Sequence, residues 1–303
     1  MYEAPPRRAL SVFATVPEKY RITGRPNYWI DMQHQGVPAP AFLEGPTFDA
    51  QGHLWVVDIP WGRLFRIAPD GSMECMVEYD GEPNGLAFGP DGRLYVADAK
   101  NGLMVFDPAR GTIAPHLERA QAQGFKGLND LTFASNGDLY FTDQGQTGHQ
   151  DPSGRLFRLT QDGRLDCLLS NVPSPNGLVL NLAEDIVWLA ATRANAIWRV
   201  PLTRQHGLVT KVGTYIQLSG GGGPDGLALD ESGGIAIAHV GLGAVWIFDK
   251  FGQPALRLDS PVGPATTNCA YGGAGRSKLY VTCGMHVLVA DVDVPGAPTP
   301  ARR

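Results

Sequence analysis

The sequence has little of what marks membrane, nucleic-acid-binding or exported proteins. It contains no run of about 18 apolar residues, so no membrane-spanning helix is expected. No run of lysine or arginine exceeds two residues and the net charge is −5, which excludes the clustered cations of a nucleic-acid-binding surface. The first residues combine charge and proline and do not resemble a signal peptide. We therefore expect a cytoplasmic protein with no membrane or nucleic-acid partner.

Motifs of several common enzyme mechanisms are also missing. There is no Gly-x-Ser-x-Gly and no His-Glu-x-x-His, which excludes a serine hydrolase of that type and a zinc protease. The glycine-rich segment 221–226 precedes an expected strand, so it does not fit a dinucleotide-binding loop, which opens a helix. The cysteines lack the close spacing of a metal or redox pair, which favours reduced and buried thiols. They are Cys75, Cys167, Cys269 and Cys283.

The chain does have ample apolar material and many turn residues. Hydrophobic residues make up 43% of its 303 residues, enough for a packed core. It holds 38 glycines and 24 prolines, which long helices tolerate poorly. A chain of this length can form two domains of average size, but large all-β folds often use it for one.

One pattern recurs six times along the chain. A small polar triplet is followed by alternating apolar residues, a glycine turn and a second apolar run, such as segment 94–97. Asp-Gly and Asn-Gly turns between apolar runs, as at Asp91-Gly92 and Asn136-Gly137, are a strong hairpin signal. The triplets, 40 to 49 residues apart, are Glu44-Gly45-Pro46, Pro83-Asn84-Gly85, Leu128-Asn129-Asp130, Pro175-Asn176-Gly177, Pro224-Asp225-Gly226 and Thr267-Asn268-Cys269.

Repeats of about 40–50 residues with about four strands are typical of β-propeller blades. We predict an all-β, six-bladed β-propeller with four-stranded antiparallel blades, forming a single domain over residues 1–303. The alternative is a β-sandwich with coincidental turns, which the nearly constant distance from triplet to return strand disfavours. Residues 10–14 are expected to close the ring with the last blade. Residues 18–42 are expected to form a lead-in over the channel mouth, and residues 295–303 a mobile tail.

The triplets predict a ring of oxygen-bearing side chains. Inner strands line the channel of a propeller, so residues at their start converge at one end of it. The ring consists of Glu44, Asn84, Asn129, Asn176, Asp225 and Asn268. Turn chemistry explains Pro-Asn-Gly and Pro-Asp-Gly, but not a glutamate in register with them. Carboxylate and amide oxygens suit a hard cation. We predict one divalent cation, Ca²⁺ first, with Mg²⁺, Mn²⁺, Zn²⁺ or Fe²⁺ as alternatives.

In their order and spacing, these motifs resemble the SMP-30/gluconolactonase (regucalcin-like) family of six-bladed propellers, which includes sugar lactonases and is related to diisopropyl fluorophosphatase. The resemblance implies that Glu44, Asn176 and Asp225 bind the metal. It also implies that Asn129 contacts metal or substrate, and that the activity is lactone hydrolysis. It covers about residues 40–290 and rests on five of the six triplets, on segment 57–60 and on segment 266–273.

One position departs from the family pattern. Relatives of the regucalcin type carry an arginine two residues before the Asn-Asp pair, where it contacts sugar-acid hydroxyls. This chain has Gly127 at that position, with Lys126 beside it. Trp61 and Arg63 follow the segment 57–60 and could contact substrate, with packing at the rim as the alternative. The expected substrate contacts are therefore Asn84, Asn129, Lys126, Trp61 and Arg63.

The expected mechanism opens a small lactone to a hydroxy acid. The metal polarises the carbonyl, Asp225 acts as general base toward water, and the amide of Asn129 stabilises the oxyanion. Two alternatives stay open. One is phosphotriester or aryl-ester hydrolysis on the same ring, and the other is a non-catalytic calcium-binding propeller. The oligomeric state is open as well.

A second set of polar residues lies fourteen positions after four members of the ring. It consists of Asp58, Asp98, Asp143 and His239. A hairpin of that length returns to its starting end, so we expect these residues around the ring. Asp143 and His239 are the first candidates for orienting metal ligands. The alternative is that these side chains bind turn amides at the strand ends.

Overall fold

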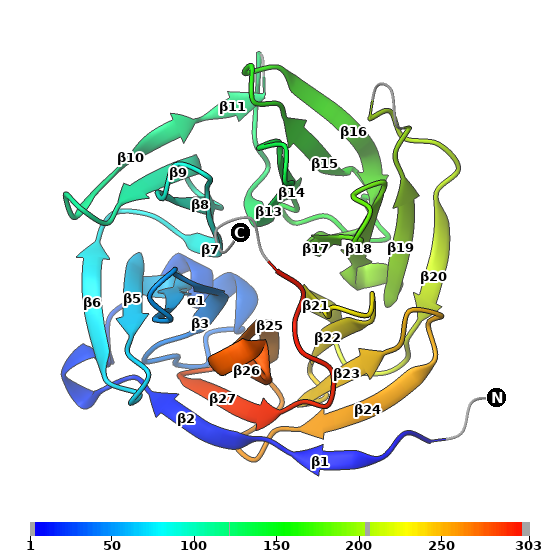
Figure 1. Ribbon diagram of the computed structural model, residues 1–303. Helices are drawn as coiled ribbons and strands as arrows, with labels where there is room; N and C mark the ends of the chain where they lie inside the picture. The colour runs from blue at the N-terminus through cyan, green and yellow to red at the C-terminus, as the bar shows by residue number, and fades with distance from the viewer. Residues whose placement is uncertain (1–3, 121, 204–206, 299–303) are drawn as a thin grey trace.

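The computed structural model describes residues 4–120, 122–203 and 207–298. In these ranges six large sheets surround a central axis, and the innermost strand of each sheet is the one that contains a polar triplet (Figure 1). Each of the six contains four antiparallel strands, and one gains a fifth, parallel strand. The predicted six-bladed β-propeller is confirmed.

The first three blades are formed by consecutive strands. Blade 1 contains β3 (Leu43–Phe48), β4 (Leu54–Asp58), β5 (Arg63–Ile67) and β6 (Met73–Glu78). Blade 2 contains β7 (Pro83–Phe88), β8 (Leu94–Asp98), β9 (Gly102–Asp107) and β10 (Thr112–Leu117). A short ribbon follows in the chain, with β11 (Arg119–Ala120) and β12 (Gln123–Gly124). Blade 3 contains β13 (Leu128–Phe133), β14 (Leu139–Asp143), β15 (Gly154–Leu159) and β16 (Leu165–Val172).

The last three blades repeat this order. Blade 4 contains β17 (Pro175–Leu180), β18 (Ile186–Ala191), β19 (Ala196–Pro201) and β20 (Gly213–Gln217). Blade 5 contains β21 (Gly223–Leu229), β22 (Ile235–Val240), β23 (Ala244–Phe248) and β24 (Pro254–Asp259). Blade 6 takes three consecutive strands, β25 (Thr266–Gly272), β26 (Lys278–Cys283) and β27 (His286–Asp291), and its fourth strand comes from the N-terminal region.

The hairpin turns follow the Asp-Gly and Asn-Gly signals. Oδ1 of Asp91 accepts the backbone N–H of Arg93 at 3.0 Å, and Gly92 between them has a φ of +76°. Oδ1 of Asn136 accepts the backbone N–H of Asp138 at 3.0 Å in the same way. The side-chain oxygen fixes the turn, and glycine adopts the left-handed conformation that other residues avoid.

The N-terminal region joins two blades. As expected for residues 10–14, β2 (Ser11–Thr15) pairs antiparallel with β27 and completes blade 6. The sequence did not predict β1 (Arg7–Ala9), which pairs parallel with β24 as the fifth strand of blade 5. Leu10, between the two strands, is buried in the hydrophobic cluster between blades 5 and 6. This burial holds both short strands against neighbouring sheets.

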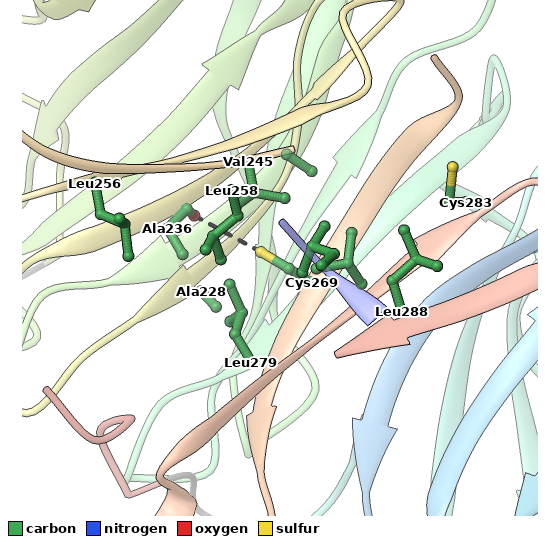
Figure 2. Close-up of a cluster of buried hydrophobic side chains, with 12 residues drawn as sticks. Ala228, Ala236, Val245, Leu256, Leu258, Cys269, Leu279, Cys283 and Leu288 are labelled. Carbon is green, nitrogen blue, oxygen red and sulfur yellow. Dashed lines mark hydrogen bonds between the residues drawn. The ribbon is translucent and has the colours of Figure 1, made fainter. Parts of the chain in front are cut away.

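The hydrophobic core is divided among the interfaces between neighbouring blades. Six clusters of buried side chains each draw on two adjacent blades. Figure 2 shows the cluster between blades 5 and 6, where Val245 and Leu258 pack near Cys269 and Leu279. Burying a side chain of this size stabilises the fold by about 1.5–3 kcal/mol. Each blade is therefore held by its two neighbours.

The segment expected to form a lead-in contains η1 (Glu18–Tyr20) and α1 (Tyr28–Gln33). The side chain of Asn27 caps α1 by accepting the N–H of Ile30 at 3.1 Å, because a helix leaves its first N–H groups without partners. Ile30 packs against Trp61 of η2 (Ile59–Trp61), which follows β4. This segment lies at the end of the channel where the inner strands begin, which we call the upper end.

The described chain after β27 runs toward the axis at the opposite, lower end of the channel (Figure 1). The backbone N–H of Gly296 donates to Arg276 at 3.0 Å, and that of Ala297 donates to Leu229 at 2.9 Å. Nε of Arg276 donates to the carbonyl of Gly296 at 2.6 Å. Of the expected tail, residues 299–303 lie outside the described ranges. Residues 295–298 connect blades 5 and 6.

Two further one-turn helices, η3 (Thr192–Ala194) and η4 (Ala274–Arg276), lie in loops between strands. None of the helices in the described ranges has the length and hydrophobicity needed to cross a membrane.

Candidate active site

The six ring residues are the second or third residues of the six inner strands. Each inner strand contacts the next, and β25 contacts β3, so the strands form a closed circle around the channel. Threonine hydroxyls strengthen this closure at the upper end. Thr142 donates to the carbonyl of Asn176 at 2.9 Å, and Thr192 donates to the carbonyl of Pro224 at 2.7 Å. Residues far apart in the sequence are thereby brought to one end of the channel.

The glycines that follow the ring residues allow the inner strands to approach closely. A Cβ atom on Gly85 would lie 2.5 Å from Oδ1 of Asp130. A Cβ atom on Gly226 would lie 1.9 Å from Oδ1 of Asn268. Both distances are far shorter than van der Waals contact. Glycine is required here because a neighbouring strand occupies the space of a side chain.

Three carboxyl groups meet at the upper end, and we call Glu44, Asp130 and Asp225 the carboxylate cluster. Glu44 and Asp130 are 3% and 9% exposed, whereas Asp225 is partly exposed. Burial raises the pKa of Glu44 to about 8, and repulsion from Asp130 adds to this shift. Burial also raises the pKa of Asp130 to about 6. Burial and repulsion from the other two carboxylates raise the pKa of Asp225 well above its ordinary value. The cluster therefore needs protons or a cation.

Asp130 belongs to the carboxylate cluster although no role was predicted for it from the sequence. Its position contained a signal, because the residue after the ring member is glycine in four of the six repeats. Four of the other five blades have no side chain at this position, and the sixth blade has Cys269. Asp130 thus joins Glu44 and Asp225 at the centre, and it also lines the upper part of the channel.

Two amide side chains bind the carboxylate cluster directly. The amide of Asn176 forms a hydrogen bond with Asp225, which opposes the rise in the pKa of that carboxyl. Nδ2 of Asn268 donates to Oδ2 of Asp130 at 3.4 Å, and the same amide bonds to Glu44. Asn268 therefore connects two of the three carboxyl groups.

Asn129 has a different environment. It is 5% exposed, and its Nδ2 donates to Oε1 of Gln144 at 3.0 Å. Its Oδ1 is buried and has no hydrogen-bond partner in the described part of the chain. A buried polar atom without a partner is costly, which indicates that a ligand completes the site.

These donors fit a hard cation. Across residues 4–120, 122–203 and 207–298, no three acidic, histidine or cysteine side chains are arranged to hold a metal by themselves. A cation at the upper end must therefore also use amide oxygens. Oδ1 of Asn129, which has no partner in the described residues, and the carboxylate cluster offer oxygen ligands, which Ca²⁺ and Mg²⁺ prefer.

A polar cavity of about 370 Å³ opens beside the ring. Gln33 of α1 lines it together with Gln144, Ser174 and Arg193. Gln144 links this cavity to Asn129, and the positive charge of Arg193 acts on Asp225. The cavity is large enough for a small cyclic ester.

A comparison with known families agrees with this architecture. A family model described as the SMP-30/Gluconolactonase/LRE-like region matches residues 42–284. The chain belongs to this family. The resemblance inferred from the sequence motifs is therefore confirmed.

Two curated relatives in this family match most of the chain. The lactonase drp35 of Staphylococcus aureus is 28% identical over 255 residues, covering 80% of this chain and 76% of the relative. A gluconolactonase of Zymomonas mobilis is 27% identical over 277 residues, covering 81% and 77%. Among solved structures, regucalcin of Agrobacterium tumefaciens, a calcium-binding protein, has a TM-score of 0.75 at 26% identity, covering 86% of this chain and 94% of that one.

Within this member of the SMP-30/gluconolactonase family, two expected substrate residues are bonded away from the cavity. Arg63 is 3% exposed, and its guanidinium forms an ion pair with Asp58 and donates to the carbonyl of Tyr20 at 2.7 Å. Trp61 is 7% exposed, and its indole N–H donates to the carbonyl of Ala39 at 3.3 Å. Both side chains connect the lead-in segment to blade 1. Neither is therefore assigned a contact with substrate.

Lys126 and Asn84 are two more of the expected substrate residues. Nζ of Lys126 donates to Oγ of Ser153 at 2.6 Å, and its exposed side chain lies against Gly145, which lines the cavity. Asn84 is partly exposed at the start of β7. The neighbouring Gly127 has a φ of +140°, a conformation that favours glycine over the arginine of regucalcin-type relatives.

The three aspartates of the second polar set bind backbone amides, which was the alternative interpretation. Asp98 accepts the N–H of Glu82 at 3.2 Å, and Asp143 accepts that of Lys126 at 2.7 Å. Asp58 accepts the N–H of Phe42 at 2.7 Å. In each case the carboxylate holds the segment that leads into the inner strand of its own blade.

His239 occupies the corresponding place in blade 5. Its Nε2 bonds to the carbonyl of Gly220 at 2.9 Å, in the glycine-rich segment that leads to Asp225. Burial lowers its pKa, which favours the neutral ring that donates from Nε2. His239 therefore holds the segment before its inner strand as the three aspartates do, but it bonds to a backbone carbonyl, whereas they bond to backbone N–H groups.

Proposed function

We propose that this protein hydrolyses a small lactone to a hydroxy acid at the upper end of the channel. The family and its lactonase and gluconolactonase members confirm the prediction of an enzyme of the lactonase class. The proposal adds that one divalent cation takes part, held by Glu44, Asn129, Asn176 and Asp225.

The cation is supported by one observation: two buried carboxyl groups and the partly exposed Asp225 interact at the end of the channel where Asn129 has a buried amide oxygen without a partner in the described chain. Two ligand carboxylates balance a charge of +2, and the nearby Asp130 and Arg193 carry opposite charges. Ca²⁺ is the first candidate because the similar Agrobacterium regucalcin is a calcium-binding protein. When bound, the cation supplies positive charge toward the lactone carbonyl and the developing oxyanion.

The protein side chains then account for binding and proton transfer. The lactone lies in the polar cavity, where Gln144, Ser174 and Arg193 offer hydrogen bonds to its oxygen atoms. Asp225, the partly exposed carboxylate, accepts a proton from the water that attacks the carbonyl carbon. Breaking of the ring C–O bond leaves an alkoxide, which takes the proton back from Asp225. One N–H of Asn129 is already bonded to Gln144, so this residue contributes its oxygen to the cation.

The test is a substrate panel measured with and without EDTA. It compares neutral sugar lactones and aliphatic lactones with aryl esters and an aryl phosphotriester. We expect hydrolysis of at least one lactone, loss of the rate in EDTA and recovery with CaCl₂. A rate that chelation does not change would remove the cation from the mechanism. Phosphotriester hydrolysis without lactone hydrolysis would overturn the proposed substrate class.

A further inference from the structure

A chain of hydrogen bonds holds the side-chain amide of Asn129 through its Nδ2 atom. Nδ2 of Asn129 donates to Oε1 of Gln144 at 3.0 Å, and Nε2 of Gln144 donates to Oγ of Ser174 at 3.0 Å. The hydroxyl of Thr147 donates to the backbone carbonyl of Gln144 at 2.6 Å and accepts the N–H of Ser174 at 3.1 Å. Gln144 therefore has partners for its side chain and for its backbone.

This chain determines which atom of the Asn129 amide is free. An amide presents an oxygen on one side and N–H groups on the other. Because Gln144 takes the N–H side, Oδ1 is left buried and without a partner in the described residues. Without Gln144, the amide could rotate and present its N–H groups where Oδ1 now lies. A cation would then meet N–H donors in place of the oxygen that it needs.

The same chain connects two blades. Gln144 follows β14 of blade 3, whereas Ser174 lies just before β17 of blade 4, two residues before Asn176. Ser174 has a φ of +60°, which is unusual for a residue other than glycine and is held here by the bonds described above. Gln144 thus bonds to one amide ligand of the proposed cation site, Asn129, and to the residue two positions before the other, Asn176.

We infer that Gln144 is a positioning residue that keeps the amide oxygen of Asn129 available to the cation. The inference rests on the proposed function, because it presumes the cation site. It goes beyond that function because it states that a residue that is not a cation ligand determines how tightly the cation binds. Partners of this kind typically change metal affinity by about 10- to 100-fold when they are removed.

The test uses three variants of the full-length protein and measures Ca²⁺ affinity by calorimetry, with no activity readout required. Gln144→Met keeps the size of the side chain but neither donates nor accepts, and we expect Ca²⁺ binding about 10- to 100-fold weaker. Gln144→Glu only accepts, so Asn129 must still offer its N–H, and we expect affinity equal to or above that of the wild type. Gln144→Lys only donates, so it favours the reversed amide, and we expect the largest loss.

Substitutions at Gln146, two residues further along the same loop and exposed, control for charge and for local disturbance. Gln146→Met is expected to leave Ca²⁺ affinity unchanged, and Gln146→Glu and Gln146→Lys measure the effect of charge alone. Thermal unfolding in EDTA checks that every variant is folded. Wild-type binding together with unchanged affinity in Gln144→Met would overturn this inference alone. A wild-type protein that binds no divalent cation would overturn the proposed function and this inference with it.

Discussion

The two ends of the central channel are built from the same six strands but have opposite chemistry. At the upper end the strands begin with acidic and amide residues, and the carboxylate cluster lies there with two of its three members buried. At the lower end they finish with apolar residues such as Phe48, Phe88 and Phe133, and residues 295–298 cross the opening. Each inner strand, six or seven residues long, therefore contributes to both ends.

The difference separates stability from chemistry. Apolar burial and backbone hydrogen bonds at the lower end favour the folded state. Buried carboxylates at the upper end oppose folding unless a cation or protons neutralise them. Such an arrangement is expected where a site is organised for a charged ligand. Substitutions at the upper end should therefore reduce catalysis and cation binding. Changes at the lower end should reduce the stability of the fold.

The largest effect is expected at Asp225. Asp225→Ala removes a proposed cation ligand and the proposed general base, so we expect lactone hydrolysis to fall by about a thousandfold. Calorimetry should show the loss of Ca²⁺ binding in the same variant. Asp91→Ala, which removes a carboxylate from a surface hairpin, is the matched control and should retain wild-type activity. Turnover of Asp225→Ala within tenfold of the wild type would contradict the assigned role.

A smaller effect at the upper end is expected from Gly226→Ala. The new Cβ would meet Oδ1 of Asn268 at 1.9 Å, so Asn268 must move away from Asp130. We expect overpacking to cost about 1–3 kcal/mol of unfolding free energy and to weaken Ca²⁺ binding. Gly213→Ala, at a position with open space around it, is the control. Equal stability and Ca²⁺ affinity in the two variants would show that the circle of inner strands is not closely packed.

At the lower end, truncation after residue 294 should affect stability without affecting catalysis. It removes the bonds of Gly296 and Ala297 to blades 5 and 6, and we expect a loss of about 1–3 kcal/mol. Thermal unfolding should show a melting temperature lower by a few degrees, with kcat within twofold of the wild type. A chain that ends at residue 298 is the control. Loss of activity at full stability would mean that the two ends are coupled.

The fold could be predicted because each blade repeats one local rule. Turn residues and alternating apolar residues recur at a nearly constant distance from the ring residue, and this pattern determines the hairpins. The strand β1 could not be predicted, because three exposed residues carry no pattern. Its place depends on the burial of Leu10 between two blades, which is a tertiary effect.

The sequence predicted that the ring residues lie at one end of the channel, and the structure places them at the start of the six inner strands. The burial of Arg63 could not be read from the sequence in the same way. It lies directly opposite Asp58 across the β4–β5 hairpin, and this pairing buries both side chains. Arg155 lies opposite Asp143 in the same way. Whether such an arginine forms an ion pair or contacts substrate depends on which residue lies opposite it in the hairpin. That pairing can be derived from the sequence only when the position of the hairpin turn is known.

The smallest effect concerns the pH dependence of the cation-free protein. Burial raises the pKa of Glu44 to about 8 and that of Asp130 to about 6, above their values in the unfolded chain. Protonation therefore favours the folded state, and this contribution is lost as the pH rises through the folded pKa values. In EDTA we expect a higher melting temperature at pH 6 than at pH 8, and a smaller difference with Ca²⁺. Glu44→Gln removes the main titrating group, so it should reduce the difference in EDTA. A melting temperature in EDTA that rises from pH 6 to pH 8 in the wild type would contradict this expectation. It would show that other titrating groups determine the pH dependence and that the ionised carboxylate cluster does not destabilise the fold.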